Sequence, residues 1–293
     1  MKQQLKGSAS LLLATVIWGS AFIAQSVGMD LIGPFTFQTI RCGMAVLFLL
    51  PCTFLFGADR NNLTKWKNPA LWKAGVICGC ALFVAASLQQ IGLVYTDAGK
   101  AGFITAMYIV LVPVLGLFLK RKPPKSAVFS ILLAVIGLYL LSCMGVTEIN
   151  QGDLCLMGCA LAYAVQITCI DHFAAHLDGL KLNCIQSLVV TVLSVPFMVL
   201  TETVDMANIL QCWLPLCYAG VLSMGVAYTL QIVGQQHLEP TTASLIMSLE
   251  SVIAALCGWL ILKETMNGWE LLGCGLVFTA VVISQLPGKT KSV

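Results

Sequence analysis

The sequence predicts an all-α integral membrane protein whose ten transmembrane helices form two inverted five-helix repeats. Three observations predict this fold class: the composition, the number of long apolar stretches, and a correspondence between the two halves of the chain. Of the 293 residues, 58% are apolar and only 10% are charged, whereas about a quarter of the residues of soluble domains are charged. A soluble fold has a large exterior that must face water. The composition therefore excludes a soluble enzyme, a disordered chain and a nucleic-acid-binding domain.

The apolar stretches define the helices. A spanning helix needs about 20 mainly apolar residues, and ten such stretches follow one another between polar, proline or glycine residues. The first follows Lys2 and Lys6, and we interpret it as a helix rather than a signal peptide because nine more spans follow. In chain order the predicted spans are 7–27, 34–56, 72–94, 98–119, 126–144, 152–171, 182–200, 211–234, 241–262 and 268–286. Their short connections leave no inserted soluble domain.

Lysine and arginine predict the orientation, because they concentrate on the cytoplasmic side of a membrane protein. Ten spans place both termini on one side. The basic residues on that side are Lys2, Lys6, Arg60, Lys65, Lys67, Lys73, Lys120, Arg121, Lys122, Lys125, Lys181, Lys289 and Lys291. Lys100 and Lys263 fall on the other side, and Arg41 falls inside a helix. We therefore expect a multi-pass protein of the cell (inner) membrane with both termini in the cytoplasm and Asp30 and Asp205 outside.

The two halves of the chain correspond to each other at a near-constant spacing. Residues that recur 142 positions later are Gln89, Gly92, Asp97, Ala101, Ile104 and Gly116, matched by Gln231, Gly234, Glu239, Ala243, Ile246 and Gly258. Residues that recur 145 positions later are Gly7, Leu11 and Trp18, matched by Gly152, Leu156 and Tyr163. Because each half has an odd number of spans, the second enters the membrane from the opposite side. Such inverted repeats, predicted here at 1–146 and 147–293, are typical of secondary transporters.

Several segments carry a resemblance to a known family. They are 18–22 (WGSAF), Arg41 seven residues past Pro34, 152–154 (GDL), 227–228 (AY), 240–250 (PTTASLIMSLE) and 262–264 (LKE). Together they resemble the EamA-type bacterial branch of the drug/metabolite transporter superfamily, over essentially the whole chain. Ser251 stands where this family usually has proline. The resemblance implies ten helices, of which the fifth and tenth are peripheral, and the export of small metabolites, often amino acids or their relatives.

Polar residues at mid-membrane form the candidate site. Such side chains are costly in the hydrocarbon centre, so their presence there suggests a function. Trp18, Tyr108, Tyr163 and Glu250 lie near the midpoints of helices 1, 4, 6 and 9, and they form two repeat-related pairs. Inverted-repeat transporters bind substrate near the midplane between repeats, so we expect one central cavity lined by helices 1, 3, 4, 6, 8 and 9. The predicted substrate-binding residues are Trp18, Tyr108, Tyr163, Gln166, Tyr228 and Glu250.

These residues also have structural interpretations. Glu250 is predicted to couple transport to protons, but it is alternatively a structural acid, neutral or paired with Arg41. Arg41 either extends outward as a structural anchor or contacts an anion such as a carboxylate or phosphate. Gln89 and Gln231 are expected to join helices rather than contact substrate. The aromatic residues alternatively fill helix interfaces.

The sequence thus predicts a secondary transporter that exports a small organic metabolite by alternating access coupled to protons. An uncoupled facilitator, or an importer of a small nutrient, is the alternative within transport. An intramembrane enzyme is disfavoured, because no paired nucleophile and base or facing acids are apparent. The expected partners are a small-molecule substrate and the lipid bilayer, with no nucleic acid, and the protein is expected to be a monomer or homodimer.

Cofactors and metals are not expected. The sequence has no glycine-rich phosphate loop that ends in Lys-Ser or Lys-Thr, so ATP hydrolysis within this chain is not predicted. His172 and His176 have a spacing that zinc can use, but they lie at a helix end. Polar residues at such a position are expected to cap the helix and meet lipid headgroups.

Overall fold

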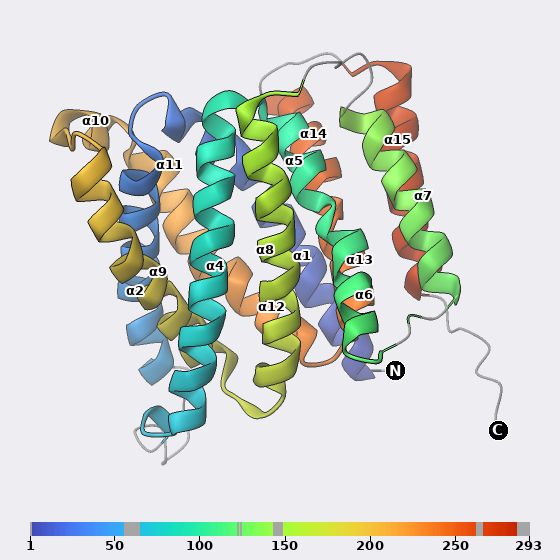
Figure 1. Ribbon diagram of the computed structural model, residues 1–293, viewed down its shortest axis with the longest axis horizontal. Coiled ribbons are helices and arrows are strands. Elements are labelled where there is room, and N and C mark those ends of the chain that lie inside the picture. Colours follow the sequence, from blue (N-terminus) through green and yellow to red (C-terminus); the bar gives the residue numbers. More distant parts are fainter. Residues whose placement is uncertain are drawn as a thin grey trace.

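The computed structural model describes residues 2–55, 65–121, 123, 125–142, 149–261 and 266–285. Within these ranges every regular element is a helix, and the helices stand side by side as a bundle (Figure 1). The predicted boundary between residues 146 and 147 lies outside the described residues. The same is true of segment 262–264 and of Arg60, Lys122, Lys263, Lys289 and Lys291.

Each half of the chain contributes a set of consecutive helices. The first half contains α1 (Lys2–Met29), α2 (Pro34–Leu55), α4 (Pro69–Tyr95), α5 (Ala98–Ala106), α6 (Tyr108–Phe118) and α7 (Lys125–Ser142). The second half contains α8 (Gln151–Phe173), η1 (Ala174–His176), α9 (Gly179–Thr201), α10 (Met206–Gln211), α11 (Trp213–Cys217), η2 (Tyr218–Ala227), α12 (Tyr228–Gln235), α13 (Pro240–Met247), α14 (Leu249–Ile261) and α15 (Gly268–Gln285). Of these, η1 is a short 3₁₀ helix and η2 is a π-helix.

The predicted spans all correspond to helical segments. Among the described residues, nine helical segments are long and apolar enough to cross a membrane, and α7 is a further, shorter apolar helix. Four of the nine are composite: α5 with α6, α8 with η1, α11 with η2 and α12, and α13 with α14. The outer surface is apolar, as a bilayer requires: Phe118 is 81% exposed and Leu200 is 82% exposed. The prediction of an all-helical multi-pass membrane protein is therefore confirmed.

Local sequence explains where several helices begin. Pro69 and Pro240 stand in the first turns of α4 and α13, where proline's missing N–H costs no hydrogen bond. Asn68 caps α4, since its side-chain oxygen accepts a hydrogen bond of 3.0 Å from the Ala70 N–H. These residues separate the apolar stretches into distinct helices. The polar and proline residues between the stretches therefore predicted where the spans begin.

Two repeat-related helix crossings use the same close contact. A Cβ atom on Gly92 would lie 2.6 Å from Leu156 Cγ, and a Cβ atom on Gly234 would lie 2.6 Å from Leu11 Cγ. Gly92 and Gly234 are equivalent positions of the two halves, and so are Leu11 and Leu156. The α4–α8 and α1–α12 crossings are therefore counterparts, and both depend on a glycine that lets helices approach closely.

Helices α7 and α15 form a peripheral pair, as the family resemblance implied. They pack against each other along one edge of the bundle (Figure 1). Their backbones meet directly, because a Cβ atom on Gly273 would lie 2.5 Å from the Gly137 carbonyl oxygen. These two helices contribute no residue to the wall of the central cavity described below.

Both ends of the described chain lie on one face of the bundle (Figure 1), which we call the termini face. The Ser8 hydroxyl of α1 donates a hydrogen bond of 2.9 Å to Gln285 Oε1 at the end of α15. Asp30 follows α1 and Asp205 precedes α10 at the other end of the bundle, which we call the opposite face.

Reporter fusions are expected to place the termini face in the cytoplasm, because the basic residues predict that orientation. The measurement uses green fluorescent protein and alkaline phosphatase fused in turn to the C-terminus. The fluorescent fusion should be active and the phosphatase fusion inactive. Active phosphatase at this position would place both termini outside and reverse the direction of transport proposed below.

A polar network joins the two halves at the opposite face. Asp153, in the first turn of α8, accepts a hydrogen bond of 3.0 Å from the Asn150 N–H, and its own N–H donates to Asn150 Oδ1 at 2.9 Å. Lys100 of α5 pairs with the same carboxylate, with 2.6 Å between Nζ and Oδ2. The Thr96 hydroxyl lies 3.1 Å from Asp153 Oδ1. This network connects α5 of the first half to α8 of the second.

Glu202, at the end of α9, holds the start of α2. Its carboxylate accepts hydrogen bonds of 2.7 Å from the N–H groups of Phe35 and Thr36 and one of 2.6 Å from the Thr36 hydroxyl. Gly33 has no side chain, and a Cβ atom there would collide with this carboxylate. A carboxylate at a helix N-terminus satisfies N–H groups that have no partner within the helix.

Replacing Glu202 by Ala is expected to destabilise the protein by about 1–2 kcal/mol, the usual cost of losing a helix cap. Thermal unfolding in detergent measures the change. Glu239→Ala is the matched control, because Glu239 precedes α13 and its side chain makes no capping hydrogen bond. Equal unfolding temperatures for wild type and Glu202→Ala would show that Glu202 does not stabilise α2.

Candidate substrate-binding cavity

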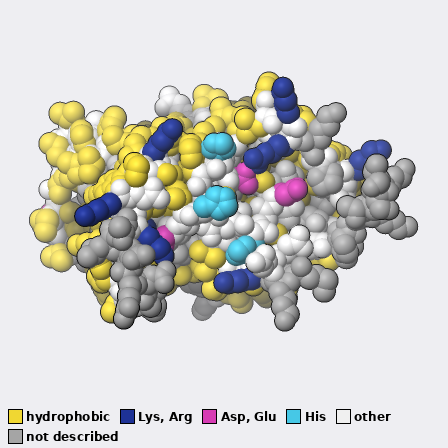
Figure 2. Space-filling model, turned by 90° about the horizontal axis from the view of Figure 1, so that it is seen from below, with side chains coloured by type: hydrophobic (Ala, Val, Ile, Leu, Met, Phe, Trp, Pro, Cys, Tyr) yellow, Lys and Arg dark blue, Asp and Glu magenta, His cyan; other side chains and the backbone are white. Residues whose placement is uncertain are grey.

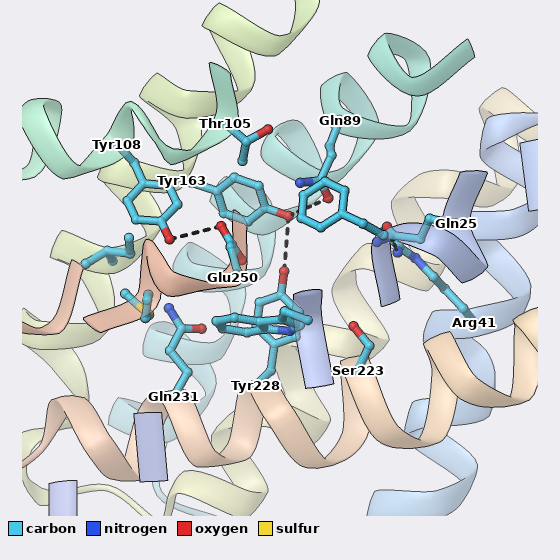
Figure 3. A pocket seen from close by; sticks show the side chains of 14 residues that line it. Gln25, Arg41, Gln89, Thr105, Tyr108, Tyr163, Ser223, Tyr228, Gln231 and Glu250 are labelled. Atoms are coloured by element: carbon cyan, nitrogen blue, oxygen red, sulfur yellow. Dashed lines mark hydrogen bonds between the residues drawn. The ribbon is translucent and has the colours of Figure 1, made fainter. Parts of the chain in front are cut away.

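A cavity of about 40 Å³ lies between the two halves of the bundle (Figure 3). Its wall is formed by both halves, through α1, α2, α4, α5, α6, α8, η2, α12, α13 and α14. The lining residues are Trp18, Phe22, Gln25, Arg41, Gln89, Thr105, Tyr108, Tyr163, Ile167, Ser223, Tyr228, Gln231, Met247 and Glu250. Aromatic walls with a few polar groups are typical of binding sites for small organic molecules.

The structure brings together five of the six predicted substrate-binding residues. Trp18, Tyr108, Tyr163, Tyr228 and Glu250 all line the cavity. Their contact with a substrate stays a prediction. The aromatic rings also pack on one another, with centroids 4.9 Å apart for Trp18 and Tyr228 in an edge-to-face arrangement.

The three glutamines are placed differently from what was expected. Gln166 does not line the cavity; it is fully buried behind the wall, where its Oε1 accepts a hydrogen bond of 3.2 Å from Gln231 Nε2. Gln89 and Gln231, which were expected to join helices, line the cavity as well. Gln89 Oε1 accepts a hydrogen bond of 3.2 Å from the Tyr163 hydroxyl. Gln89 and Gln231 therefore join helices, as expected, and also present polar atoms to the cavity.

Arg41 does not extend outward to the surface. Its side chain is buried, with only 2% of the residue exposed, and it lines the cavity. Its Nη1 donates a hydrogen bond of 2.5 Å to Gln25 Oε1, and its guanidinium lies 5.6 Å from the centre of the Phe37 ring. Helix α2 thus joins the helices that were predicted to line the cavity. Depth along a helix does not reveal which way a side chain points, so the outward interpretation was wrong.

Glu250 pairs with Tyr108 rather than with Arg41. The Tyr108 hydroxyl donates a hydrogen bond of 3.0 Å to Glu250 Oε1, and both side chains are buried. Tyr108 and Glu250 are equivalent positions of the two halves. Their contact therefore places the pseudo-twofold axis of the repeat at the cavity, as the repeat predicted (Figure 3).

Each residue of this pair lies next to an irregular turn of its helix. The fourth span is irregular at Met107, between α5 and α6, and the ninth at Ser248, between α13 and α14, although both residues keep right-handed helical backbone angles. Tyr108 follows the first irregular residue directly, and Glu250 lies two residues after the second. The ninth span has no proline at this place, and the Ser251 hydroxyl there donates a hydrogen bond of 3.1 Å to the Gly102 carbonyl.

The repeat accounts for most of the cavity wall. Five pairs of lining residues occupy equivalent positions: Trp18 and Tyr163, Phe22 and Ile167, Gln89 and Gln231, Thr105 and Met247, and Tyr108 and Glu250. Sequence reasoning missed Phe22, Ile167, Thr105 and Met247, although the same spacings of 145 and 142 connect them. Extending the repeat by one helical turn on either side of the predicted residues would have found all four.

A second, much larger cavity opens on the termini face, with a volume of about 1020 Å³. It lies between the ends of α6, α8, α12 and α13, which come from both halves. Arg121 and Asp171 form an ion pair in its wall, and His237 also lines it. Figure 2 shows this face, with histidine, basic and acidic side chains gathered at its middle.

This arrangement defines a class of protein: a multi-pass membrane transporter with two inverted halves around a central polar cavity. The EamA-like transporter family matches the chain twice, at residues 5–143 and 150–285. The chain therefore belongs to the EamA-like transporter family, within the drug/metabolite transporter superfamily. It is a transporter and not an enzyme.

Relatives and a solved structure agree with this assignment. An Archaeoglobus fulgidus protein described as an uncharacterized transporter is 34% identical over 287 residues, which cover 97% of this chain and 87% of the relative. The threonine/homoserine exporter RhtA of Escherichia coli is 26% identical over 286 residues, 94% of this chain and 90% of its own. A crystal structure that is 16% identical superposes with a TM-score of 0.74 over 93% of this chain and 96% of its own, and it supports the fold.

Proposed function

We propose that the chain exports a small organic metabolite, an amino acid or a related compound, by alternating access, and that protons drive the export. One observation carries the proposal: the Tyr108–Glu250 hydrogen bond lies in the wall of a central cavity between two inverted halves. Transporters of this architecture bind substrate at that place. RhtA, a relative whose name gives threonine and homoserine as its substrates, supports the substrate class.

The cavity offers a solute both apolar walls and free polar atoms. Trp18, Tyr163 and Tyr228 supply aromatic surface. Trp18 Nε1 and Gln231 Oε1 are buried and have no hydrogen-bond partner among the described residues. Because buried polar atoms normally have partners, a bound solute or water is expected to satisfy these two. They supply one donor and one acceptor.

Transport requires the halves to move. A buried water needs a cavity volume of about 10–15 Å³. The central cavity, with about 40 Å³, therefore has room for about three waters. A metabolite therefore fits only when the lining helices separate. In the proposed cycle, a solute enters through the larger cavity on the termini face. The halves then close behind it and open on the opposite face.

Glu250 is proposed to carry the proton. It shares the central cavity with the solute, and its carboxyl is accessible from one side of the membrane at a time. A carboxyl in this position binds a proton when the site opens to the more acidic exterior and releases it after the site opens to the cytoplasm. Export and proton entry then use the same conformational change in opposite directions.

Transport by the purified protein in proteoliposomes tests the proposal. Vesicles are loaded with individual metabolites, amino acids among them, and efflux is measured with and without an imposed pH gradient. Protein-dependent efflux that accelerates when protons move inward supports the proposal. Efflux that ignores the gradient would leave an uncoupled facilitator, and uptake without efflux would indicate an importer. If no solute crosses, the proposed function is wrong.

A further inference from the structure

One end of the central cavity departs from the repeat. Gln25, Arg41, Ser223 and Tyr228 line the cavity, but the residues at their equivalent positions, Ile170, Gln186, Ala81 and Ala86, do not. All four have an amide, guanidinium or hydroxyl group, and Figure 3 shows Gln25, Arg41 and Ser223 together on the side away from Tyr108. Glu250 lies toward the other side of the cavity. The polar groups that the repeat does not explain are thus concentrated at one end.

Arg41 is the central residue of this group, and no acidic side chain among the described residues pairs with its positive charge. A guanidinium has five N–H donors, and the side-chain hydrogen bond that Arg41 makes to an oxygen among the described residues goes to the neutral amide of Gln25. Its Nε is buried without a partner among the described residues. The ion pairs in the described part of the chain are Lys100–Asp153, Arg121–Asp171 and Lys181–Asp178. Arg41 therefore has no carboxylate partner there.

The residues around Arg41 fix its position without neutralising it. Gln25 Nε2 donates a hydrogen bond of 3.3 Å to the Ala21 carbonyl, which directs its Oε1 toward Arg41. The π-helix η2 packs closely on α2, because a Cβ atom on Gly220 would lie 2.9 Å from the Arg41 carbonyl oxygen. This contact places Ser223 of η2 at the same end of the cavity. π-Helical segments are rare and frequent at functional sites.

A buried cation without an acid partner is energetically costly unless an anion accompanies it. The planar guanidinium matches the two oxygens of a carboxylate, and the Ser223 hydroxyl adds a donor. One cation among neutral groups suits an anion with a single charge. The aromatic rings of Trp18, Tyr163 and Tyr228 line the same cavity, and a ring face is a favourable neighbour for a solute ammonium group.

We propose that Arg41, with Gln25 and Ser223, forms the subsite that binds the carboxylate of the transported solute. The inference rests on the proposed transport function and deepens it, because it restricts the substrate to organic carboxylates, including zwitterionic amino acids. Amines, amides and neutral sugars lack the group that Arg41 requires.

Matched solute pairs test the subsite on the wild-type protein. The probes are L-threonine and other common amino acids, each compared with its amide and with the amine that lacks the carboxyl group. Thermal unfolding in detergent reports binding, and efflux from proteoliposomes reports transport. At least one acid is expected to raise the unfolding temperature and to be transported, while its amide and amine do neither. Amides or amines that act as well as the acids would overturn the subsite but leave transport intact.

Variants of Arg41 identify the group responsible. Arg41→Gln is expected to weaken binding of the acid about 10- to 100-fold, the usual effect of losing charged hydrogen bonds, and to remove the preference for acid over amide. Arg41→Lys keeps the charge and should retain part of that preference. Lys73→Gln is the control for charge alone, since Lys73 is exposed on α4 and does not line the cavity.

The outcomes separate the two proposals. Unchanged acid preference in a folded Arg41→Gln variant would overturn the subsite. Binding of acids without transport would support the subsite and contradict the transport function. If wild type neither binds nor transports any acid, the subsite is wrong whatever else is carried.

Discussion

Glu250→Gln is expected to abolish proton-driven accumulation while exchange of solute across the membrane continues. The substitution keeps the size of the side chain and the acceptor for the Tyr108 hydroxyl, which lies 3.0 Å from Oε1, but it removes the exchangeable proton. With one proton per solute, a gradient of one pH unit should drive about tenfold accumulation in wild type. In the variant the two compartments should reach equal concentrations. Proteoliposomes with an imposed pH gradient measure this difference.

Glu270→Gln is the matched control for Glu250→Gln. Both residues lie in the first turn of a helix, but Glu270 stands on peripheral α15 and does not line the cavity. The control should accumulate solute as wild type does. If Glu250→Gln still follows the gradient, another residue carries the proton. If wild type ignores the gradient, Glu250 binds substrate or serves a structural purpose.

Gly19→Ala is expected to lower both transport and stability, because α1 and α14 touch at this glycine. A Cβ atom on Gly19 would lie 2.6 Å from Ile253 Cβ and 2.7 Å from the Glu250 carbonyl oxygen. Backbone atoms cannot rotate away, so α14 must shift and carry Glu250 with it. Overpacking of this kind typically costs about 1–3 kcal/mol. Thermal unfolding and efflux assays on the same preparation measure the two effects.

Gly275→Ala separates the packing effect from the general effect of adding a methyl group. Gly275 lies within α15, and a Cβ atom there would have no heavy atom within 4 Å. Alanine in an open helical position is expected to be neutral or to stabilise by about 0.5–1 kcal/mol, because it favours the helix more than glycine does. A Gly19→Ala variant that behaves like Gly275→Ala would show that α1 and α14 are not held in contact at the site.

Much of the fold could be predicted because lipid imposes a simple rule: a spanning segment must be long, apolar and helical. The repeat then located Trp18, Tyr108, Tyr163 and Glu250 in one cavity before any contact was known. The direction of the Arg41 side chain could not be predicted in this way. Its depth was clear from the sequence, but its direction depends on how α2 packs against the other helices, and this is a property of the tertiary structure.

The irregular helices were also beyond the sequence pattern. Apolar periodicity does not distinguish an α-helix from a π-helix, so η2 and the position of Ser223 were not predicted. The irregular turn at Ser248 has no proline in the three residues that follow it. Hydrogen bonds between distant residues, such as that from Ser251 to Gly102, stabilise these departures. The local sequence alone does not encode them.

The network at the opposite face gives the resting protein a preferred conformation. Lys100 and Asp153 join the halves there, with side chains 15% and 4% exposed, and their repeat equivalents near the termini face are Thr242 and Ser8, which cannot form an ion pair. Arg121 and Asp171 join the halves on the termini face instead, but Arg121 is 54% exposed, so this pair is expected to contribute less. Perfectly equal halves would make the two conformers equally populated, whereas each 1.4 kcal/mol of difference favours one conformer about tenfold. The unloaded carrier should therefore wait with its larger cavity open on the termini face. If that face is cytoplasmic, the unloaded carrier presents its cavity to the compartment that holds the solute, and the solute and proton gradients then determine the direction of net transport.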